Sequence, residues 1–340
     1  MFEIGPKHPL TYRQEIVVPF FNRVLSAESC ATVGSASMGK TRLLDFLMRS
    51  DVQANFLGEQ ADHTLLLRAD CNRLVQISEW GLCELMLTAI VEGCVQNPKA
   101  RAWRKQLNDL REPVILKENA LLALRHLELA VSILVKENEI KLCFLLDEFD
   151  TAYRSLPLLA LFHLRALRDS NKNRLSYALF LRNTPETLRN PAECESFYEL
   201  FSRYVFGLGP YSPTDVTRIV SQIEERRNYH VSLTAKEKLI SLSGGHPGLI
   251  LALFDILTEK PRLIEEENVG ALVGEPLIVE ECTKLWMSLS EDERQGLADV
   301  SQSIPLSVEI RARLALKGLV TGDILFSPLF FRYVQKLSGS

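Results

Sequence analysis

The sequence lacks the long hydrophobic runs and the leader-like end that would direct a chain into or across a membrane. No apolar stretch approaches the roughly 18 residues that a membrane-spanning helix needs. The first residues, Met-Phe-Glu-Ile-Gly-Pro, hold no basic region followed by an apolar run, which excludes a secretory signal peptide. We therefore expect a cytoplasmic protein with no membrane partner.

Cysteine pairs with metal-binding or redox spacing are also missing. The seven cysteines stand among apolar neighbours without any C-x-x-C pair, and an odd number argues against a disulfide framework. We expect buried free thiols in a reducing compartment. Four histidines are isolated and show no metal-ligand spacing. These residues are Cys30, Cys71, Cys83, Cys94, Cys143, Cys194 and Cys282, and His63, His126, His163 and His230.

Charge of one sign is not in excess either. The 340 residues carry a net charge of −4, with 46% hydrophobic and 24% charged residues, as in ordinary globular proteins. This balance gives no general attraction to nucleic acid, although a local basic face remains compatible with it. No internal repeat or low-complexity segment is found, and the length predicts about two or three domains.

The most informative segment present is a complete phosphate-loop motif. Residues 34–41 read Gly-Ser-Ala-Ser-Met-Gly-Lys-Thr, which matches G-x-x-x-x-G-K-[ST]. Gly34 and Gly39 let the chain coil with its N–H groups facing a phosphate. Lys40 supplies a cation to the β- and γ-phosphates, and the Thr41 hydroxyl is suited to ligate Mg²⁺. A strand-like run before the loop and helical spacing after it support the motif.

A second motif, made of acidic residues, lies about 107 residues downstream of the phosphate loop, at the end of a predicted buried strand. Acids at this place suit the chemistry of a bound phosphate. The run Lys-Leu-Cys-Phe-Leu-Leu-Asp-Glu-Phe-Asp over 141–150 ends in acids at the edge where parallel sheets bind ligands. We expect Asp147 to hold the hydration shell of Mg²⁺ and Glu148 to polarise the attacking water. Asp150 is read as a possible cap of the next helix.

Strand-like runs alternate with amphipathic helices over the first part of the chain, and this predicts an α/β fold with a parallel sheet covered on both faces. The expected strands are 30–33, 64–68, 141–146, 175–181 and 204–208, with helices near 42–49, 77–95, 117–138 and 157–170. The polar segment 97–113 reads as a solvated charged face in preference to a partner-binding loop.

Two further domains are predicted after residue 209. No strand-like run interrupts 210–275, so this segment is expected to be a small all-helical lid that follows a nucleotide-binding domain over 1–209. Residues 276–340 show three helices, two short apolar runs around a Thr-Gly-Asp turn, and a last helix. This is a winged-helix pattern.

Taken together, these motifs resemble the AAA+/STAND class of P-loop ATPases over residues 10–337. The resemblance implies that Arg13, in Tyr-Arg-Gln-Glu at 12–15, contacts adenine, although Tyr12 replaces the usual glycine. It also implies that Pro247, in Gly-Gly-His-Pro-Gly at 244–248, packs on the base, while the same residues satisfy a helix stop and start. The implied nucleotide-binding set is Gly34, Ser35, Ala36, Ser37, Met38, Gly39, Lys40, Thr41, Arg42, Arg13, His246 and Pro247.

The resemblance assigns two further arginines to catalysis beside Lys40 and Glu148. Arg182 follows the fourth strand and is the favoured sensor of the γ-phosphate, with Asn183 as the alternative. Arg203, just before the last strand, is either an arginine finger that reaches a neighbouring subunit or a surface arginine at a helix end.

The implied function is an ATP-binding, Mg²⁺-dependent molecular switch of STAND type, which hydrolyses ATP slowly to ADP and self-associates in the ATP state. The stretch 247–259 contains no arginine, and this favours a switch over a remodelling motor. The effector is expected to be either a separate partner protein or a surface of this chain itself. The alternative is a DNA-associated AAA+ ATPase that binds duplex DNA through its winged helix. Packing of the winged helix on the nucleotide domain is favoured, because few basic residues stand on the candidate recognition helix.

Overall fold

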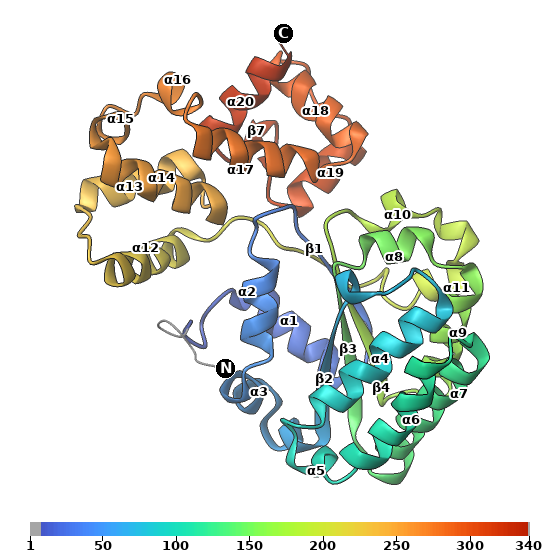
Figure 1. Cartoon of the computed structure of the whole chain (residues 1–340). Coiled ribbons are helices and arrows are strands. Elements are labelled where there is room, and N and C mark those ends of the chain that lie inside the picture. The colour runs from blue at the N-terminus through green and yellow to red at the C-terminus, as the bar shows by residue number, and fades with distance from the viewer. Residues whose placement is uncertain (1–7, 339–340) are drawn as a thin grey trace. The chain divides into compact units, whose positions relative to one another are not determined.

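The computed structural model describes residues 8–338 (Figure 1). The segment that the signal-peptide argument concerns, residues 1–6, lies outside these residues. The chain divides into two compact units that interleave along the sequence. One unit comprises 15–32 and 44–206, and the other comprises residues up to 14, 33–43 and 207 onward.

The first of these units is organised around a parallel sheet in the order β2-β3-β4-β1-β5. The strands are β1 (Cys30–Val33), β2 (Thr64–Asp70), β3 (Lys141–Asp147), β4 (Leu175–Leu181) and β5 (Val205–Gly207). Thr64 of β2 pairs with Lys141 of β3, and the register runs in parallel to Asp70 and Asp147. All seven residues of β4 are buried, as expected for a strand with helices on both faces.

Helices cover this sheet and account for most of the remaining residues of the unit. Helix α4 packs on β2, and α6 and α7 pack on α4. The polar segment after residue 97 is itself helical: Leu107 and Val114 of α6 are buried, while Arg101, Arg104 and Lys105 are exposed. The helices are α1 (Gln14–Leu25), α2 (Lys40–Leu47), α3 (Ser50–Leu57), α4 (Glu79–Gly93), α5 (Pro98–Arg101), α6 (Arg104–Leu116), α7 (Ala120–Ser132), α8 (Asp150–Ser155), α9 (Leu158–Asp169), α10 (Pro185–Leu188) and α11 (Glu195–Tyr198).

The lid of the second unit is built from helices whose ends are set by local capping residues. Ser212 and Ser232 cap the N-termini of α12 and α13 with their hydroxyls. Gly244 ends α13 in the left-handed conformation, and Pro247 then begins α14. The lid helices are α12 (Pro213–Arg227), α13 (Leu233–Ser243), α14 (Pro247–Glu259), α15 (Pro261–Glu265) and α16 (Val269–Leu272).

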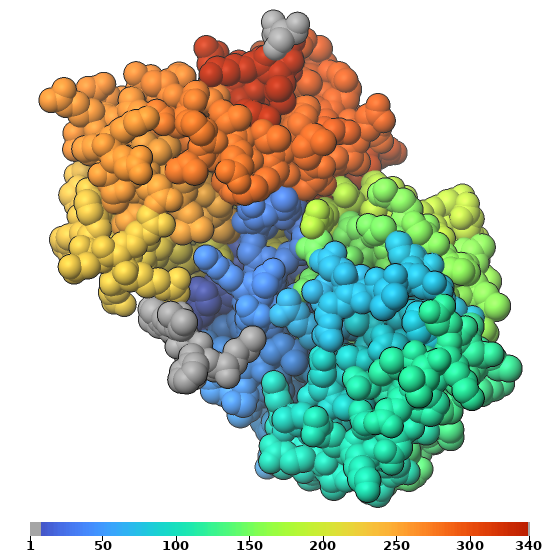
Figure 2. All heavy atoms as spheres, viewed as in Figure 1, coloured from blue at the N-terminus to red at the C-terminus, as the bar shows by residue number. Residues whose placement is uncertain are grey.

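The winged-helix segment follows and packs on the lid. Helix α14 contacts α17, and α13 contacts α20. In Figure 2 the lid, yellow to orange, and the winged helix, orange to red, meet in a continuous surface on the face shown. The elements are α17 (Pro276–Met287), α18 (Glu291–Ser301), α19 (Val308–Leu316), the antiparallel pair β6 (Val320–Thr321) and β7 (Ile324–Leu325), and α20 (Pro328–Ser338).

The predicted fold class is confirmed: a parallel α/β sheet is followed in the chain by helical lid and winged-helix segments. The boundaries 1–209, 210–275 and 276–340 stay a prediction, because the two compact units divide the chain differently. All seven cysteines are buried free thiols. Within residues 8–338, no helix is long and apolar enough to cross a membrane.

Candidate functional site

The phosphate loop lies between β1 and α2, and its backbone has the coiled conformation that the motif predicts. Gly39 has φ +87° and Ser37 has φ +58°, both in the left-handed region. A Cβ atom at Gly34 would lie 2.8 Å from the Cβ of Leu208, so only glycine fits there. The motif therefore needs its first glycine for close approach and its second for backbone conformation.

Two polar side chains of the loop are buried. Lys40 Nζ donates a hydrogen bond to the Gly34 carbonyl over 2.9 Å, and Lys40 is 7% exposed. Ser35 is fully buried, and its hydroxyl finds no hydrogen-bond partner among the residues that the structure describes. Buried polar groups are nearly always satisfied, so this hydroxyl is consistent with an additional ligand at the loop. Thr41 is exposed and Arg42 half-buried.

Arg13 is almost completely buried against the loop. Its guanidinium donates to the carbonyl of Met38 at 3.0 Å and to the carbonyl of Gly209 at 2.9 Å. It also lies 4.2 Å from the ring centroid of Tyr211, and the hydroxyls of Tyr12 and Tyr211 are 3.1 Å apart. Arg13 therefore connects the phosphate loop to the start of the lid through these hydrogen bonds. Burial raises the pKa of the neighbouring Tyr12 hydroxyl. Whether Arg13 also contacts adenine stays a prediction.

The Gly-Gly-His-Pro-Gly turn of the lid lies beside the phosphate loop. A Cβ atom at Gly39 would stand 4.0 Å from Pro247. His246 is fully buried; its Nδ1 accepts from the Leu249 N–H at 3.1 Å, and its Nε2 is 3.3 Å from the Ala36 carbonyl. Burial lowers the pKa of His246 to about 4, so the imidazole is neutral at pH 7. Nδ1 and Nε2 of His246 thus each contact a backbone group, of Leu249 and Ala36 respectively.

The winged helix adds a contact that sequence reasoning missed. Ser288, directly after α17, accepts a hydrogen bond from the Ala36 N–H at 3.1 Å. No motif marks this serine, because the contact joins positions 252 residues apart. Only its place at a helix end, where serine often bonds back to the chain, could have drawn attention to it.

In the other unit, the acids predicted from the third strand stand at the carboxyl edge of the sheet. Asp147 ends β3, is 4% exposed, and forms an ion pair with Arg68 of β2 at 2.8 Å. Arg68 also pairs with Asp45 at 2.8 Å. Burial raises the pKa of Asp147 more than the nearby Arg68 lowers it. Arg68 was not predicted, because only strand register brings it to this edge.

Glu148 and Arg182, both assigned to catalysis, lie together at the same edge. Their side chains form an ion pair at 2.6 Å. Glu148 has φ +49°, an unfavourable conformation for a residue with a side chain. Asp150 accepts hydrogen bonds from the backbone N–H groups of Arg182 and Asn183 at 2.9–3.1 Å. It therefore fixes the exit of β4, whereas the sequence suggested that it caps its own helix.

Arg203 lies at the opposite edge of the sheet from Asp147 and Glu148. It precedes β5, so it stands at the amino end of a strand, whereas the acids follow the carboxyl end of β3. It is exposed and lines a polar pocket of about 320 Å³ together with Arg165 and Arg168. A role at a neighbouring subunit remains a prediction, as does the surface-arginine alternative.

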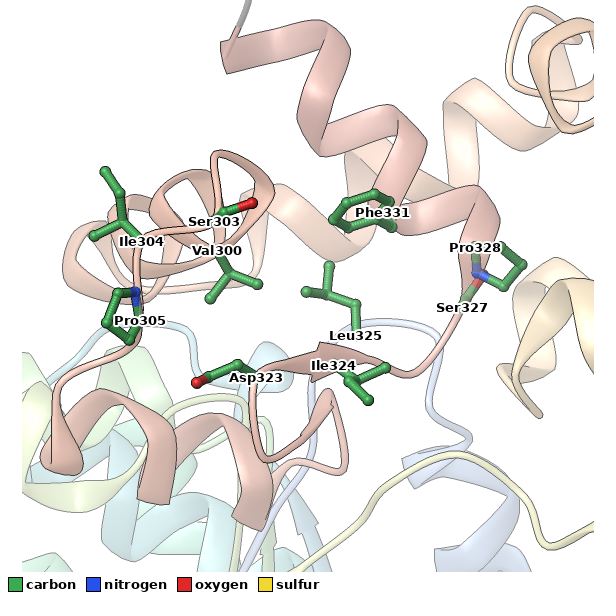
Figure 3. Close-up of a pocket in the computed structure, with 10 residues that line it drawn as sticks. All are labelled: Val300, Ser303, Ile304, Pro305, Asp323, Ile324, Leu325, Ser327, Pro328 and Phe331. Atoms are coloured by element: carbon green, nitrogen blue, oxygen red, sulfur yellow. The ribbon is translucent and has the colours of Figure 1, made fainter.

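The two arginines of α19, the candidate recognition helix, form ion pairs. On α19, Arg311 pairs with Asp323 at 3.0 Å and Arg313 with Asp292 at 3.6 Å. Beside the wing, a pocket of about 580 Å³ opens between α18, β7 and α20 (Figure 3). Its lining is largely apolar, and Asp323 is the charged residue among the ten that form it. Both arginines of α19 therefore already have an acidic partner.

The structure thus brings the predicted site residues together in two groups. Residues 34–40 lie with Arg13, His246 and Pro247 in one unit, and Asp147, Glu148 and Arg182 lie together in the other. Among residues 8–338, no cluster of three or more His, Cys, Asp or Glu is placed to hold a metal ion. A Mg²⁺ ion bound through one carboxylate and substrate phosphates does not need such a cluster.

Comparison with solved structures supports the assignment of the fold. A Walker-type ATPase of Pyrococcus abyssi is similar over 97% of this chain and 99% of its own, with a TM-score of 0.58 and 15% identity. The ORC2 protein of Aeropyrum pernix, solved as ADPNP–ADP complexes, matches over 99% and 97% of the two chains, with a TM-score of 0.51 and 15% identity. No family model matches the sequence, and no curated protein matches it.

These likenesses define a class by fold. The chain has the fold of P-loop ATPases of the AAA+ class, with the lid and winged-helix segments included in the matched length. The resemblance seen in the motifs is therefore confirmed at the level of architecture. At 15% identity, the likeness does not extend to activity.

Proposed function

We propose that the protein is an ATP-binding and slowly hydrolysing molecular switch of STAND type. One observation carries the proposal: the phosphate loop contacts three other segments of its unit. Arg13 binds its Met38 carbonyl, His246 of the lid meets its Ala36 carbonyl, and Ser288 of the winged helix binds its Ala36 N–H. A ligand that reshapes this loop must change contacts with the lid and the winged helix, which is what a switch requires.

The residues fit a nucleotide with Mg²⁺. The loop combines a left-handed Gly39, a buried lysine and the unsatisfied hydroxyl of Ser35, which together suit an anionic ligand with several acceptor oxygens. Thr41 and Asp147 are the proposed ligands of Mg²⁺, because hard cations prefer hydroxyl and carboxylate oxygens. The ion would neutralise charge on the β- and γ-phosphates during transfer. Arg13 and Pro247 are proposed to contact the adenine.

Hydrolysis is proposed to depend on Glu148, whose carboxylate would orient and polarise the attacking water. Its ion pair with Arg182 holds the carboxylate in place, and Asp150 in turn fixes the backbone of Arg182. Arg182 would leave this pair to contact the γ-phosphate.

The central test compares nucleotide binding and turnover in three variants. Lys40→Ala should weaken binding of ATP strongly, whereas Glu148→Gln should keep binding and lose turnover. Lys105→Ala, an exposed lysine on α6, is the matched control and should behave as wild type. Titration with a fluorescent ATP analogue and a phosphate-release assay measure the two properties. Binding that survives Lys40→Ala unchanged would refute the proposal.

Two partner proposals accompany the switch. Self-association in the ATP state would follow if Arg203 completes the site of a second copy, so Arg203→Ala should lower ATP-dependent assembly in analytical ultracentrifugation. Duplex DNA is the less favoured partner, because Arg311 and Arg313 are engaged in ion pairs. Filter binding at low salt, with and without ATP, separates these alternatives. A separate effector protein remains part of the proposal.

A further inference from the structure

The backbone of Ala36 is contacted at both its N–H and its carbonyl, by residues from different parts of the same compact unit. Its N–H donates to the hydroxyl of Ser288 at 3.1 Å, and its carbonyl lies 3.3 Å from His246 Nε2. Ser288 directly follows α17, the first helix of the winged-helix segment, and His246 caps the N-terminus of the lid helix α14. One residue of the phosphate loop therefore contacts both the lid and the winged helix.

The hydrogen positions in this arrangement follow from the partners. Ser288 Oγ donates its proton to the Leu285 carbonyl at 2.7 Å, so its lone pairs are available to the Ala36 N–H. Nδ1 of His246 accepts from Leu249, and the neutral ring must therefore carry its proton on Nε2. The imidazole thus donates to the Ala36 carbonyl. Both contacts are mutually consistent and partly buried: Ser288 is 8% exposed, His246 is fully buried and Ala36 is half-buried.

Resting on the proposed function, we infer that the Ser288 hydroxyl competes with a nucleotide phosphate for the Ala36 N–H. Backbone N–H groups of a phosphate loop are the donors that bind phosphate oxygens. A hydrogen bond to an anionic oxygen is roughly twice as strong as one to a neutral hydroxyl, so the phosphate displaces Ser288. Displacement removes one contact that holds the end of α17 on the loop.

The consequence is a negative linkage between nucleotide binding and docking of the winged helix. Any free energy that Ser288 contributes to docking is subtracted from nucleotide binding, because linkage between two events is reciprocal. His246 acts differently, since it contacts the carbonyl of Ala36 and does not compete for the Ala36 N–H. Ser288 is therefore a regulatory residue of the nucleotide site that acts through the phosphate loop.

The test measures the affinity of the full chain for a non-hydrolysable ATP analogue and for ADP. Ser288→Ala should raise affinity for the triphosphate by about 3- to 10-fold, the effect of removing one competing hydrogen bond. Ser301→Ala is the matched control, because Ser301 also ends a helix and donates to the carbonyl three residues back. Ser288→Thr keeps the hydroxyl and should restore the wild-type affinity.

A second readout follows the winged helix itself. In wild type, the ATP analogue should increase amide hydrogen exchange over residues 285–289, and Ser288→Ala should show raised exchange before any nucleotide is added. Equal affinities of wild type and Ser288→Ala, with binding lost in Lys40→Ala, would overturn this inference and leave the proposed function standing. Absence of nucleotide binding in the wild type would overturn both.

Discussion

The guanidinium of Arg68 lies 2.8 Å from the carboxylate of Asp147 and joins the ends of β2 and β3. The same side chain also pairs with Asp45, so one arginine connects two acids of very different exposure. Asp147 is buried and depends on this cation, whereas the Asp45 side chain is 64% exposed and remains solvated. The pair therefore matters chiefly for Asp147.

Replacement of Arg68 by methionine should lower the free energy of unfolding by about 1–3 kcal/mol at pH 7.5, because it leaves a buried carboxylate without its partner. The loss should shrink as the pH falls, since a protonated Asp147 needs no cation. Urea denaturation of wild type and variant at several pH values measures this. Arg73→Met is the control: Arg73 and Glu92 are half exposed, and their pair should contribute less than about 1 kcal/mol. Equal losses at both arginines would contradict the argument.

The sequence sufficed for the architecture where the chemistry is local. The phosphate loop is contiguous, and Pro247 and Gly244 mark helix ends by their own backbone preferences. Asp147 and Glu148 were found because they follow directly from a buried apolar run. These features need no knowledge of distant contacts.

What the sequence could not predict depends on register and on tertiary packing. Arg68 is one of many arginines until strand pairing brings it to Asp147. The local sequence around Asp150 suggests a helix cap, because its contact with the exit of β4 spans 32 residues and leaves no local pattern. Ser288 carries no pattern at all. Each of these residues contacts a residue of the predicted site, and none of these contacts is marked by a local pattern in the sequence.

Acid should destabilise the protein through His246. Burial lowers the pKa of this imidazole to about 4 from 6.5, so the unfolded chain binds its proton more readily than the folded one. The contribution of His246 to the free energy of unfolding is therefore fully present above about pH 6.5. As the pH falls toward 4, this contribution decreases by about 1.4 kcal/mol for each pH unit. Glu281 of α17 is the charged neighbour, and it opposes part of this shift.

The variant His246→Asn keeps a side chain that caps α14 and removes the titration, so the slope of stability against pH between 6.5 and 4 should flatten. Chemical denaturation at four or five pH values provides the slope. His230→Asn is the control, because the side chain of His230 is 96% exposed. A slope that is unchanged in His246→Asn would show that other groups govern acid stability.

The fully buried ion pair of Lys317 and Glu293 should make single substitutions costly. Lys317 Nζ lies 2.8 Å from Glu293 Oε2, and the side chains of Lys317 and Glu293 are 0% and 1% exposed. Glu293 also completes the capping box of α18. Lys317→Met should destabilise by about 3–5 kcal/mol, because it leaves a buried charge unpaired. The double variant Lys317→Met with Glu293→Gln should lose less stability than Lys317→Met, because glutamine is uncharged and preserves the capping hydrogen bond. Thermal melts of the single and double variants decide; a double variant less stable than Lys317→Met alone would contradict the explanation.

The left-handed conformation of Glu148 predicts an inverted preference between glycine and alanine. At φ +49°, a Cβ atom is unfavourable by about 1 kcal/mol, so Glu148→Gly should be more stable than Glu148→Ala by that amount. Both variants lose the carboxylate and its ion pair with Arg182, so the difference between their free energies of unfolding reports the cost of the backbone conformation alone. At Glu112, an exposed position within α6, the order should reverse, with alanine more stable by about 1 kcal/mol. Denaturant titrations of the four variants supply both differences. If glycine offers no advantage at 148, the backbone there is not strained, and its geometry cannot be attributed to the demands of a catalytic carboxylate.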